Sequence, residues 1–426
     1  VILEIFESSK KQGIRSVDKI CHRMELGKDT YTLGKIRPEM EEELCRVLAD
    51  FVRIMEGYRV DAYRAMASSA ISEAANSLYV LGKIRQLTGL SVTVLSNSEQ
   101  RFLGYKALAA MEDNFNKIIE KGTAILDLDG GSFQISLFDK DALVTTQNIR
   151  MGSLRIRERL AGIQSETEHY EEMVEELIWN EVSSFKKMYL KDRKIENIML
   201  IGDVFTDSVY QNIEEKTTKI ISRENFNTWY EKIIRQSPME LAVKLGIPLE
   251  NASLMYPSAV IYKCLIDMMG AEHIWIPGVH MTRGIAYEYA EQMKLLKGGH
   301  NFENDILMAA KNIGKRYAVN RPHVQNLEMT ALAMFDATKK MHGMKERERL
   351  LLQMAVMLHD VGKYISFNNV ADSSYNIIMS NEIIGLSHIE REMVALIARY
   401  NTVTLPSYDE LVMESSLSAE QYLTVS

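Results

Sequence analysis

The stretch GTAILDLDGGSFQISLF, residues Gly122 to Phe138, decides the fold of the first part of this chain. The apolar run before the glycines and the strand-like residues after them predict a β-hairpin with Gly130 and Gly131 in its turn. Paired glycines let backbone N–H groups approach an anion, and a neighbouring carboxylate such as Asp127 can hold the cation that accompanies phosphate. An ordinary Asp-Gly hairpin turn explains the same residues equally well, so the motif alone leaves both interpretations open.

Length and composition indicate a folded protein of several domains. A chain of 426 residues exceeds the usual size of a single hydrophobic core, so we expect two or three domains. The 46% hydrophobic and 25% charged residues are typical of an ordinary soluble globular protein. The net charge of −8 argues against nucleic acid as the principal partner, because nucleic-acid-binding proteins usually neutralise phosphates with a basic surface.

The cysteines and the apolar runs indicate the cellular compartment, and the chain ends indicate whether the sequence is part of a longer protein. Cys21, Cys45 and Cys264 are far apart and lack metal-like spacing, which indicates buried thiols in a reducing cytoplasm. No apolar run reaches the length that spans a membrane, so we expect no membrane partner. The chain opens at Val1 in an apolar strand and closes at Ser426 within a helical pattern, so we expect both ends to be cut from a longer protein.

The order of the predicted elements divides the chain into three segments. Strands and helices alternate in residues 1–116 and again in residues 117–297, which is typical of α/β domains. Residues 298–426 have the pattern of helices with short loops, and Lys297 to His300 is the predicted linker. The predicted helices cover residues 38–56, 69–88, 166–189, 328–341, 346–359 and 390–400, and the predicted strands cover 91–95, 143–149, 197–201 and 273–276.

Four stretches together resemble the exopolyphosphatase and guanosine pentaphosphate phosphatase family. They occur in the family's order and at its spacing over roughly the first three hundred residues, so the joint match is specific although each motif alone is weak. The resemblance implies two actin-like α/β domains, with a ribonuclease H-like fold shared with actin and the sugar kinases, and a first strand hairpin lying before Val1. The stretches are AMASSAISEAANS (65–77), TGLSVTVLSNSEQRFLGYKAL (88–108), AILDLDGGSFQISLF (124–138) and MGSLRIRERL (151–160).

The helical segment resembles the HD-like all-α domain of longer family members. MAVMLHDVGKYI, residues Met354 to Ile365, looks like the His-Asp helix of that domain, and His323 falls where its first histidine is expected. Two further histidines are missing, because VADSSYNII and Asn401 stand in their places. A pair such as His359 and Asp360 in an apolar helix is more often a hydrogen-bonded core pair than a ligand set, so we expect no metal here. The resemblance implies that this domain, truncated at its C-terminal end, forms a homodimer and helps to bind long polyphosphate.

The resemblance also places the site in the cleft between the two actin-like domains. Family members release a terminal phosphate there, which requires a positioned water, a base, and cations or N–H donors for the developing charge. By position, Asp127 is the carboxylate that binds metal or positions water, and Mg²⁺ is the metal expected if the site is active. The residues expected to contact phosphate are Gly130, Gly131 and Ser132 of the turn and Gly202 and Thr206 of a second loop.

The expected general base is altered in this chain. The second glutamate of the family's Gly-x-Glu-Glu-Ala-Arg stretch is Gln100 here, and an amide orients water but accepts no proton. Loss of a base typically lowers the rate by about 10² to 10⁴. Glu99 is a possible substitute, but adjacent helical residues point about 100° apart, so we expect it to face elsewhere. In the turn, Gln134 replaces a second carboxylate, and Asp129 replaces a glycine, where it either adds a metal ligand or repels phosphate.

Three more polar positions of the family are changed. Ser72 stands where the family has an arginine directed at phosphate. In the second loop, IGDVFTDS, we expect Phe205 to crowd the ligand and Asp203 to add negative charge. The family's late Arg-Glu-Gly signature is replaced by residues 282–284, which read Thr-Arg-Gly.

These features leave competing functions. The first is a cytoplasmic, Mg²⁺-dependent phosphohydrolase that releases terminal phosphate from polyphosphate or guanosine pentaphosphate, weakened by the loss of its base. The second is a non-catalytic protein that binds polyphosphate or a guanosine nucleotide and uses domain closure as a switch, which the accumulated changes at polar positions favour. A third is nucleotide hydrolysis at the His-Asp pair of the helical domain.

Overall fold

The computed structural model describes residues 1–11, 13–111, 115–140, 142–160, 170–212, 219–296 and 300–426. The chain forms two compact units. One comprises residues 1–141 and 147–300, and the other comprises residues 142–146 and 301–426. Of the predicted linker, Lys297 to Gly299 lie outside the described residues, and the boundary expected at residue 116 stays a prediction.

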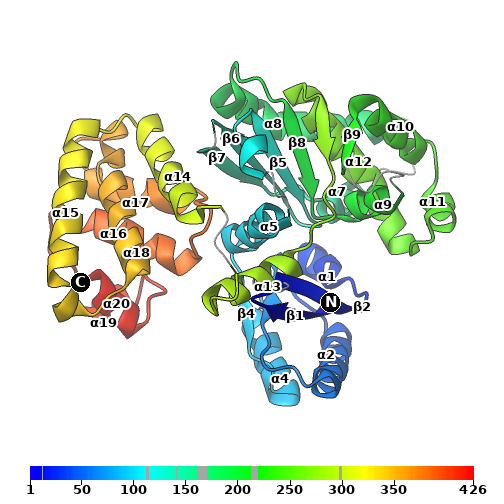
Figure 1. Cartoon of the computed structure of the whole chain (residues 1–426), viewed down its shortest axis with the longest axis horizontal. Helices are drawn as coiled ribbons and strands as arrows, with labels where there is room; N and C mark the ends of the chain where they lie inside the picture. Colours follow the sequence, from blue (N-terminus) through cyan, green and yellow to red (C-terminus); the bar gives the residue numbers. More distant parts are fainter. Residues whose placement is uncertain (12, 112–114, 141, 161–169, 213–218, 297–299) are drawn as a thin grey trace. The chain divides into compact units, whose positions relative to one another are not determined.

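The N-terminal part of the first unit contains two small sheets (Figure 1). Strands β1 (Ile2–Ser9) and β2 (Gly13–Cys21) form an antiparallel hairpin, and β3 (Ala65–Ala67) pairs in parallel with β4 (Val92–Val94). The hydrophobic faces of the surrounding helices bury a common core that includes Leu44, Val80 and Ile84. The helices are α1 (Leu26–Leu33), α2 (Pro38–Tyr58), α3 (Ser69–Ser72) and α4 (Ser77–Thr88).

The prediction of one continuous helix over residues 69–88 is wrong, because the chain leaves the helix between α3 and α4. Asn76 is the reason: its side chain accepts a hydrogen bond from the backbone N–H of Ile36 at 3.0 Å and donates one to the Ile36 carbonyl at 2.8 Å. An asparagine that satisfies a distant backbone in this way competes with helical hydrogen bonding at its own position.

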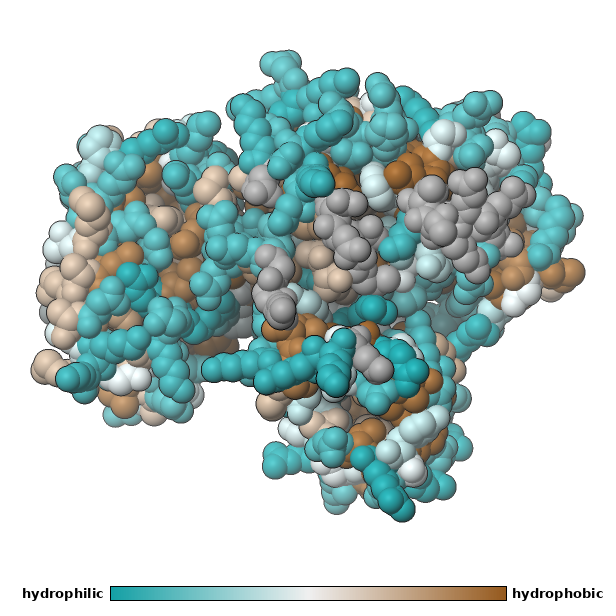
Figure 2. Space-filling model, viewed as in Figure 1, coloured by the Kyte–Doolittle hydropathy of each residue, from teal (hydrophilic) through white to brown (hydrophobic). Residues whose placement is uncertain are grey.

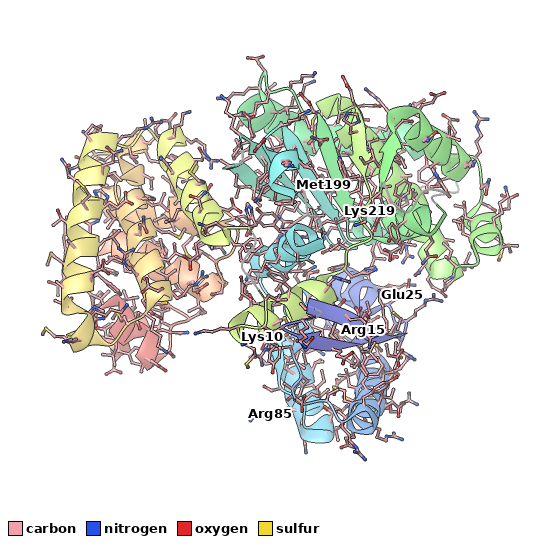
Figure 3. All side chains as sticks on the ribbon, viewed as in Figure 1. Lys10, Arg15, Glu25, Arg85, Met199 and Lys219 are labelled. Carbon is pink, nitrogen blue, oxygen red and sulfur yellow. The ribbon has the colours of Figure 1, made fainter. Side chains whose placement is uncertain are left out.

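The largest sheet described has six strands in the order β7-β6-β5-β8-β10-β9. Strand β5 is antiparallel to β6 and parallel to β8, and Asp127 lies opposite Ile201 in this register. Strand β8 is buried along its whole length, including Met199, which Figure 3 labels. Continuous burial explains why β8 is an apolar run without alternation. The bounds are β5 (Thr123–Leu128), β6 (Phe133–Asp139), β7 (Ala142–Ile149), β8 (Asn197–Ile201), β9 (Ile220–Ser222) and β10 (His273–Trp275).

Helices lie around this sheet, whereas α13 lies beside β1 and packs against α5 (Figure 1). Most residues of α12 are buried. Strands at 143–149, 197–201 and 273–276 are confirmed to within a residue, whereas the three-residue strand β9 was not predicted. The helices are α5 (Asn97–Met111), α6 (Phe115–Ile119), α7 (Ser153–Leu160), α8 (Tyr170–Phe185), α9 (Val204–Asn212), α10 (Arg223–Ile234), α11 (Pro238–Leu245), α12 (Leu249–Met269) and α13 (Met281–Gln292).

The second unit is helical, as predicted for residues 298–426. Its core contains Met354, Leu358 and Val361, none of which is exposed, so the apolar positions of the His-Asp helix pack inward. The helices are α14 (Phe302–Arg316), α15 (Arg321–His342), α16 (Glu346–Leu358), α17 (Val370–Ser380), α18 (His388–Arg399), α19 (Tyr408–Leu411) and α20 (Ala419–Val425), with a 3₁₀ turn at Val361–Tyr364.

The surface is mainly hydrophilic in the view of Figure 2, with separate small hydrophobic patches. Among the helices described, none combines the length and the apolar character needed to cross a membrane. Cys21, Cys45 and Cys264 are free thiols, of which Cys21 is exposed and the other two are buried.

Candidate functional site

The glycine turn between β5 and β6 is held by its own aspartate. Asp129 Oδ1 accepts hydrogen bonds from the backbone N–H groups of Gly131 at 2.7 Å and Ser132 at 2.8 Å, and the Asp129 N–H donates to the Ser132 carbonyl at 3.0 Å. The carboxylate therefore takes the backbone donors that were expected to meet phosphate. The side chain builds the turn, and the two roles left open for Asp129, adding a metal ligand or repelling phosphate, stay predictions.

Arg101 of α5 lies against the carboxylates of Asp127 and Asp129. Its Nη1 is 2.6 Å from Asp127 Oδ1, and its Nη2 is 2.8 Å from Asp129 Oδ2. Nη2 also donates to Ser132 Oγ at 3.0 Å. Burial raises the pKa of Asp127 to about 6, and the guanidinium opposes that shift, so the carboxyl is ionised at neutral pH and paired with Arg101. This arginine was not among the predicted site residues, although it lies within the quoted stretch 88–108.

Gln100 faces the same group of residues. Its Nε2 donates to Asp129 Oδ2 at 3.2 Å, while its Oε1 is buried and has no hydrogen-bond partner among the described residues. Glu99 does not join them: its carboxylate accepts from the Ser96 N–H at 2.9 Å and from Ser96 Oγ at 2.7 Å. These bonds cap the start of α5, as in a capping box. Gln100 thus lies at the turn, whereas the Glu99 carboxylate faces Ser96. The helical spacing predicted that the two side chains point in different directions.

The second predicted loop lies beside Asp127. Gly202 follows β8 with a φ of +111°, and a Cβ there would lie 2.4 Å from the Leu128 carbonyl oxygen and 2.7 Å from Asp127 Oδ1. Only glycine fits, because the loop crosses the end of β5 at backbone distance. Thr206 lies one turn into the following helix and donates from Oγ1 to the Asp203 carbonyl at 2.8 Å, so its hydroxyl proton is used locally.

Asp203 and Phe205 differ from their expected roles. Phe205 is fully buried against the rings of Phe226 and Tyr262, at centroid distances of 5.8 and 5.4 Å, so the prediction that it crowds a ligand is wrong. Asp203 accepts from the Thr206 N–H at 3.1 Å and begins α9. Burial raises the pKa of Asp203 to about 7, so the negative charge expected there is only partly present at neutral pH.

A second group of side chains surrounds Gly131. The Tyr31 hydroxyl bonds with Ser69 Oγ at 3.0 Å, and a Cβ on Gly131 would lie 2.5 Å from that hydroxyl oxygen. Arg155 lies over the Tyr31 ring at 4.5 Å and donates from Nε to the Gly131 carbonyl at 2.9 Å. Burial raises the pKa of Tyr31 to about 12, so the phenol stays protonated. Arg155 lies in the quoted stretch 151–160, whereas nothing in the sequence distinguishes Tyr31.

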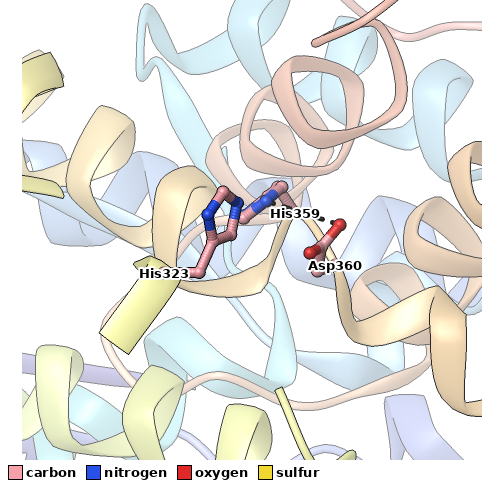
Figure 4. Close-up of side chains that lie close together, drawn as sticks. All are labelled: His323, His359 and Asp360. Atoms are coloured by element: carbon pink, nitrogen blue, oxygen red, sulfur yellow. Dashed lines mark ion pairs between the residues drawn. The ribbon is translucent and has the colours of Figure 1, made fainter. Parts of the chain in front are cut away.

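The second unit brings three potential metal ligands together (Figure 4). Ligand atoms of His323, His359 and Asp360 all lie within 4.8 Å of one another. His359 Nδ1 donates to the Val356 carbonyl at 2.8 Å, and its Nε2 lies 3.4 Å from Asp360 Oδ1. Two imidazoles and a carboxylate suit a transition metal, although Lys363 Nζ also bonds Asp360 at 2.5 Å. The expectation of a hydrogen-bonded core pair without metal stays a prediction.

Together these features define an α/β protein that carries acidic groups and two glycine loops at the ends of adjacent central strands, followed by a helical domain. Comparison of the chain with sequence profiles of known protein families identifies its family. The profile of the Ppx/GppA phosphatase family matches residues 5–293, and that of the Ppx/GppA phosphatase domain III matches residues 307–423. The chain therefore belongs to the Ppx/GppA phosphatase family.

Individual relatives are distant but cover most of the chain. A guanosine-5'-triphosphate,3'-diphosphate pyrophosphatase of Photobacterium profundum is 19% identical over 414 residues, which are 96% of this chain and 79% of that protein. The crystal structure of an exopolyphosphatase from Cytophaga hutchinsonii aligns with a TM-score of 0.60 at 16% identity, over 70% of this chain and 96% of that one. The Aquifex aeolicus family member aligns with a TM-score of 0.56 at 16% identity, over 68% and 94%. The predicted fold, an actin-like α/β region with a helical domain after it, is confirmed.

Proposed function

We propose that this protein is a slow phosphohydrolase that releases the terminal phosphate of polyphosphate or guanosine pentaphosphate at the glycine turn. One observation carries the proposal: Asp127 at the end of β5 and Gly202 after the parallel strand β8 lie in direct contact. Ligands of α/β proteins bind where the carboxyl ends of parallel strands meet, and the turn of residues 129–132 lies at that edge. The substrate class is taken from relatives named as a guanosine pentaphosphate-type pyrophosphatase and an exopolyphosphatase.

Slow turnover is expected from the groups present. Hydrolysis of a phosphoanhydride needs an aligned water and a group that accepts its proton. Gln100 can orient water through its Oε1, which has no hydrogen-bond partner in the described part of the chain, but it cannot accept the proton. Glu99 is committed to Ser96, and the ionised Asp127 carboxylate is already paired with Arg101. The site therefore positions water better than it deprotonates it.

A second candidate is binding without turnover. The hydrogen bond from Gln100 to Asp129 and the ion pairs of Arg101 with Asp127 and Asp129 favour this candidate. These contacts satisfy polar groups of the site with one another and so leave them less available for catalysis. We also expect the protein to act in the cytoplasm as a homodimer, with the substrate held between the two actin-like domains; these parts of the proposal extend beyond the family assignment.

A phosphate-release assay with polyphosphate and with guanosine pentaphosphate tests the proposal. The wild type should release phosphate slowly, and Gln100→Glu should raise the rate by about 10² to 10⁴, because a carboxylate there can act as a base. Gln86→Glu, an exposed change on α4, is the matched control and should leave the rate unchanged. Tight polyphosphate binding with no release by either protein would favour the second candidate, and neither binding nor release would overturn both.

A further inference from the structure

The guanidinium of Arg101 occupies the space between two carboxylates that a metal ion would need. It donates to Asp127 Oδ1 at 2.6 Å and to Asp129 Oδ2 at 2.8 Å from two different nitrogens. It also donates to Ser132 Oγ at 3.0 Å and to the Ser132 carbonyl at 3.3 Å. The side chain is 2% exposed, so water does not compete for these contacts. Charge-assisted bonds of this kind are short and strong.

The remaining oxygens of the two aspartates are also committed or turned away. Asp129 Oδ1 accepts the two N–H groups that form the turn, and its Oδ2 accepts from Gln100 as well as from Arg101. Asp127 Oδ2 faces the backbone of α5, since a Cβ on Gly104 would lie 3.3 Å from it. Mg²⁺ requires near-octahedral oxygen ligands at about 2.0–2.1 Å. The residues present therefore do not fit a Mg²⁺ ion at this position.

Charge leads to the same conclusion. A divalent ion bound by both carboxylates would lie within a few ångströms of the guanidinium, and arginine does not lose its proton in proteins. Repulsion between such charges is strong in a buried site, where water screens it poorly. The ion pair and a bound cation are thus mutually exclusive.

We propose that Arg101 takes the place of a divalent cation in this site, so that Asp127 and Asp129 do not bind Mg²⁺ or Mn²⁺ in this protein. Any phosphate release at the turn then needs no divalent ion held by these two carboxylates. This inference concerns only the metal, and it holds whether the site hydrolyses its ligand or merely binds it. It differs from the Mg²⁺ dependence expected from the resemblance.

Mn²⁺ binding followed by electron paramagnetic resonance tests the inference. The parent for all variants is His323→Ala, which removes one ligand of the His323, His359 and Asp360 group so that Mn²⁺ held there does not confuse the result. The parent and its Asp127→Asn variant should bind the same amount of Mn²⁺, because Asp127 holds no ion. Arg101→Met, which keeps much of the volume and removes the charge, should bind about one equivalent of Mn²⁺, and adding Asp127→Asn should abolish it.

Arg37→Met is the matched control, because Arg37 also pairs with a buried carboxylate, Asp29, at 2.9 Å, without a second aspartate in the pair. It should gain no Mn²⁺. Mn²⁺ binding by the parent that depends on Asp127 would overturn the inference, as would a folded Arg101→Met that binds none.

Thermal unfolding of the His323→Ala parent keeps the test decisive if Arg101→Met fails to fold, since an unpaired buried carboxylate destabilises a protein. A ligand that binds only the folded state raises the Tm, and the rise grows with the ratio of the ligand concentration to its Kd. The Tm should be the same in Mg²⁺ and in a chelator. A rise in Mg²⁺ that disappears in Asp127→Asn would contradict the inference. Phosphate release is measured in the same two buffers, so that loss of activity and loss of metal binding are scored separately.

Discussion

Gly284 of α13 packs directly against the backbone of Leu103 in α5. A Cβ on Gly284 would lie 1.9 Å from the Leu103 carbonyl oxygen, so the two helices cross at a distance that only glycine permits. The Thr-Arg-Gly stretch of residues 282–284 differs from the family's Arg-Glu-Gly signature but keeps this glycine, and the close packing explains why. The helix so positioned, α5, carries Gln100 and Arg101.

Gly284→Ala should destabilise the protein by about 1–3 kcal/mol or more, because the added methyl meets backbone that cannot rotate away. Urea unfolding measures the change. Gly82→Ala is the control: Gly82 is an exposed residue within α4, and a Cβ there meets nothing within 4 Å. That change should stabilise by up to about 1 kcal/mol, since alanine favours helix more than glycine does. Equal effects of the two substitutions would contradict the close helix crossing.

Asp203→Asn should remove a pH dependence of stability. Burial raises the pKa of Asp203 to about 7 from 3.8, so its contribution to stability is fully present below the unfolded-state value and is lost as pH rises through about 7. At pH 8 the asparagine variant should be more stable than the wild type, by at most about 4 kcal/mol for a shift of roughly three units. Asparagine can still cap α9.

Urea unfolding of both proteins between pH 4 and pH 8 checks this prediction. The difference between variant and wild type should grow in favour of the variant as pH increases. A constant difference across that range would show that Asp203 has an ordinary pKa in the folded protein.

Ser374→Ala should weaken the second unit. Ser374 Oγ accepts from the Gly362 N–H at 2.9 Å and donates to the His359 carbonyl at 2.8 Å, and the side chain is fully buried. The change leaves a buried N–H without its partner, which costs about 1–3 kcal/mol. Thermal unfolding followed by circular dichroism measures it. Ser373→Ala, at the half-buried neighbouring position, should have little effect.

The His323, His359 and Asp360 group should bind a transition metal. The three ligand atoms lie close enough together, and the Val356 carbonyl fixes His359 with Nε2 available. Co²⁺ added to the apoprotein should produce visible d–d absorption, which His359→Ala should abolish. His388→Ala, a histidine on α18 outside the group, should retain the absorption. Identical spectra for wild type and His359→Ala would show that the group is a hydrogen-bonded core pair, as the sequence indicated.

The candidate site was only partly predictable. Gln100, Asp127, the glycine turn and Gly202 were identified from motifs, and the structure brings them together. Arg101 was missed because α5 is buried along residues 101–108, so its sequence has no polar face from which the direction of a charged side chain can be inferred. Tyr31 was missed because its contact with Ser69 joins distant segments and leaves no local pattern.

The sequence by itself determined most strands of the central sheet, the turn and the family, since apolar runs, paired glycines and motif order reflect local backbone preference and continuous burial. The close approaches at Gly202 and Gly284 show that single residues in it also encode packing. Only the tertiary structure decided which charges meet. Arg101 reaches Asp127 and Asp129 because α5 packs on the end of β5, and such a pairing depends on the position of a helix relative to a sheet, which no periodicity specifies.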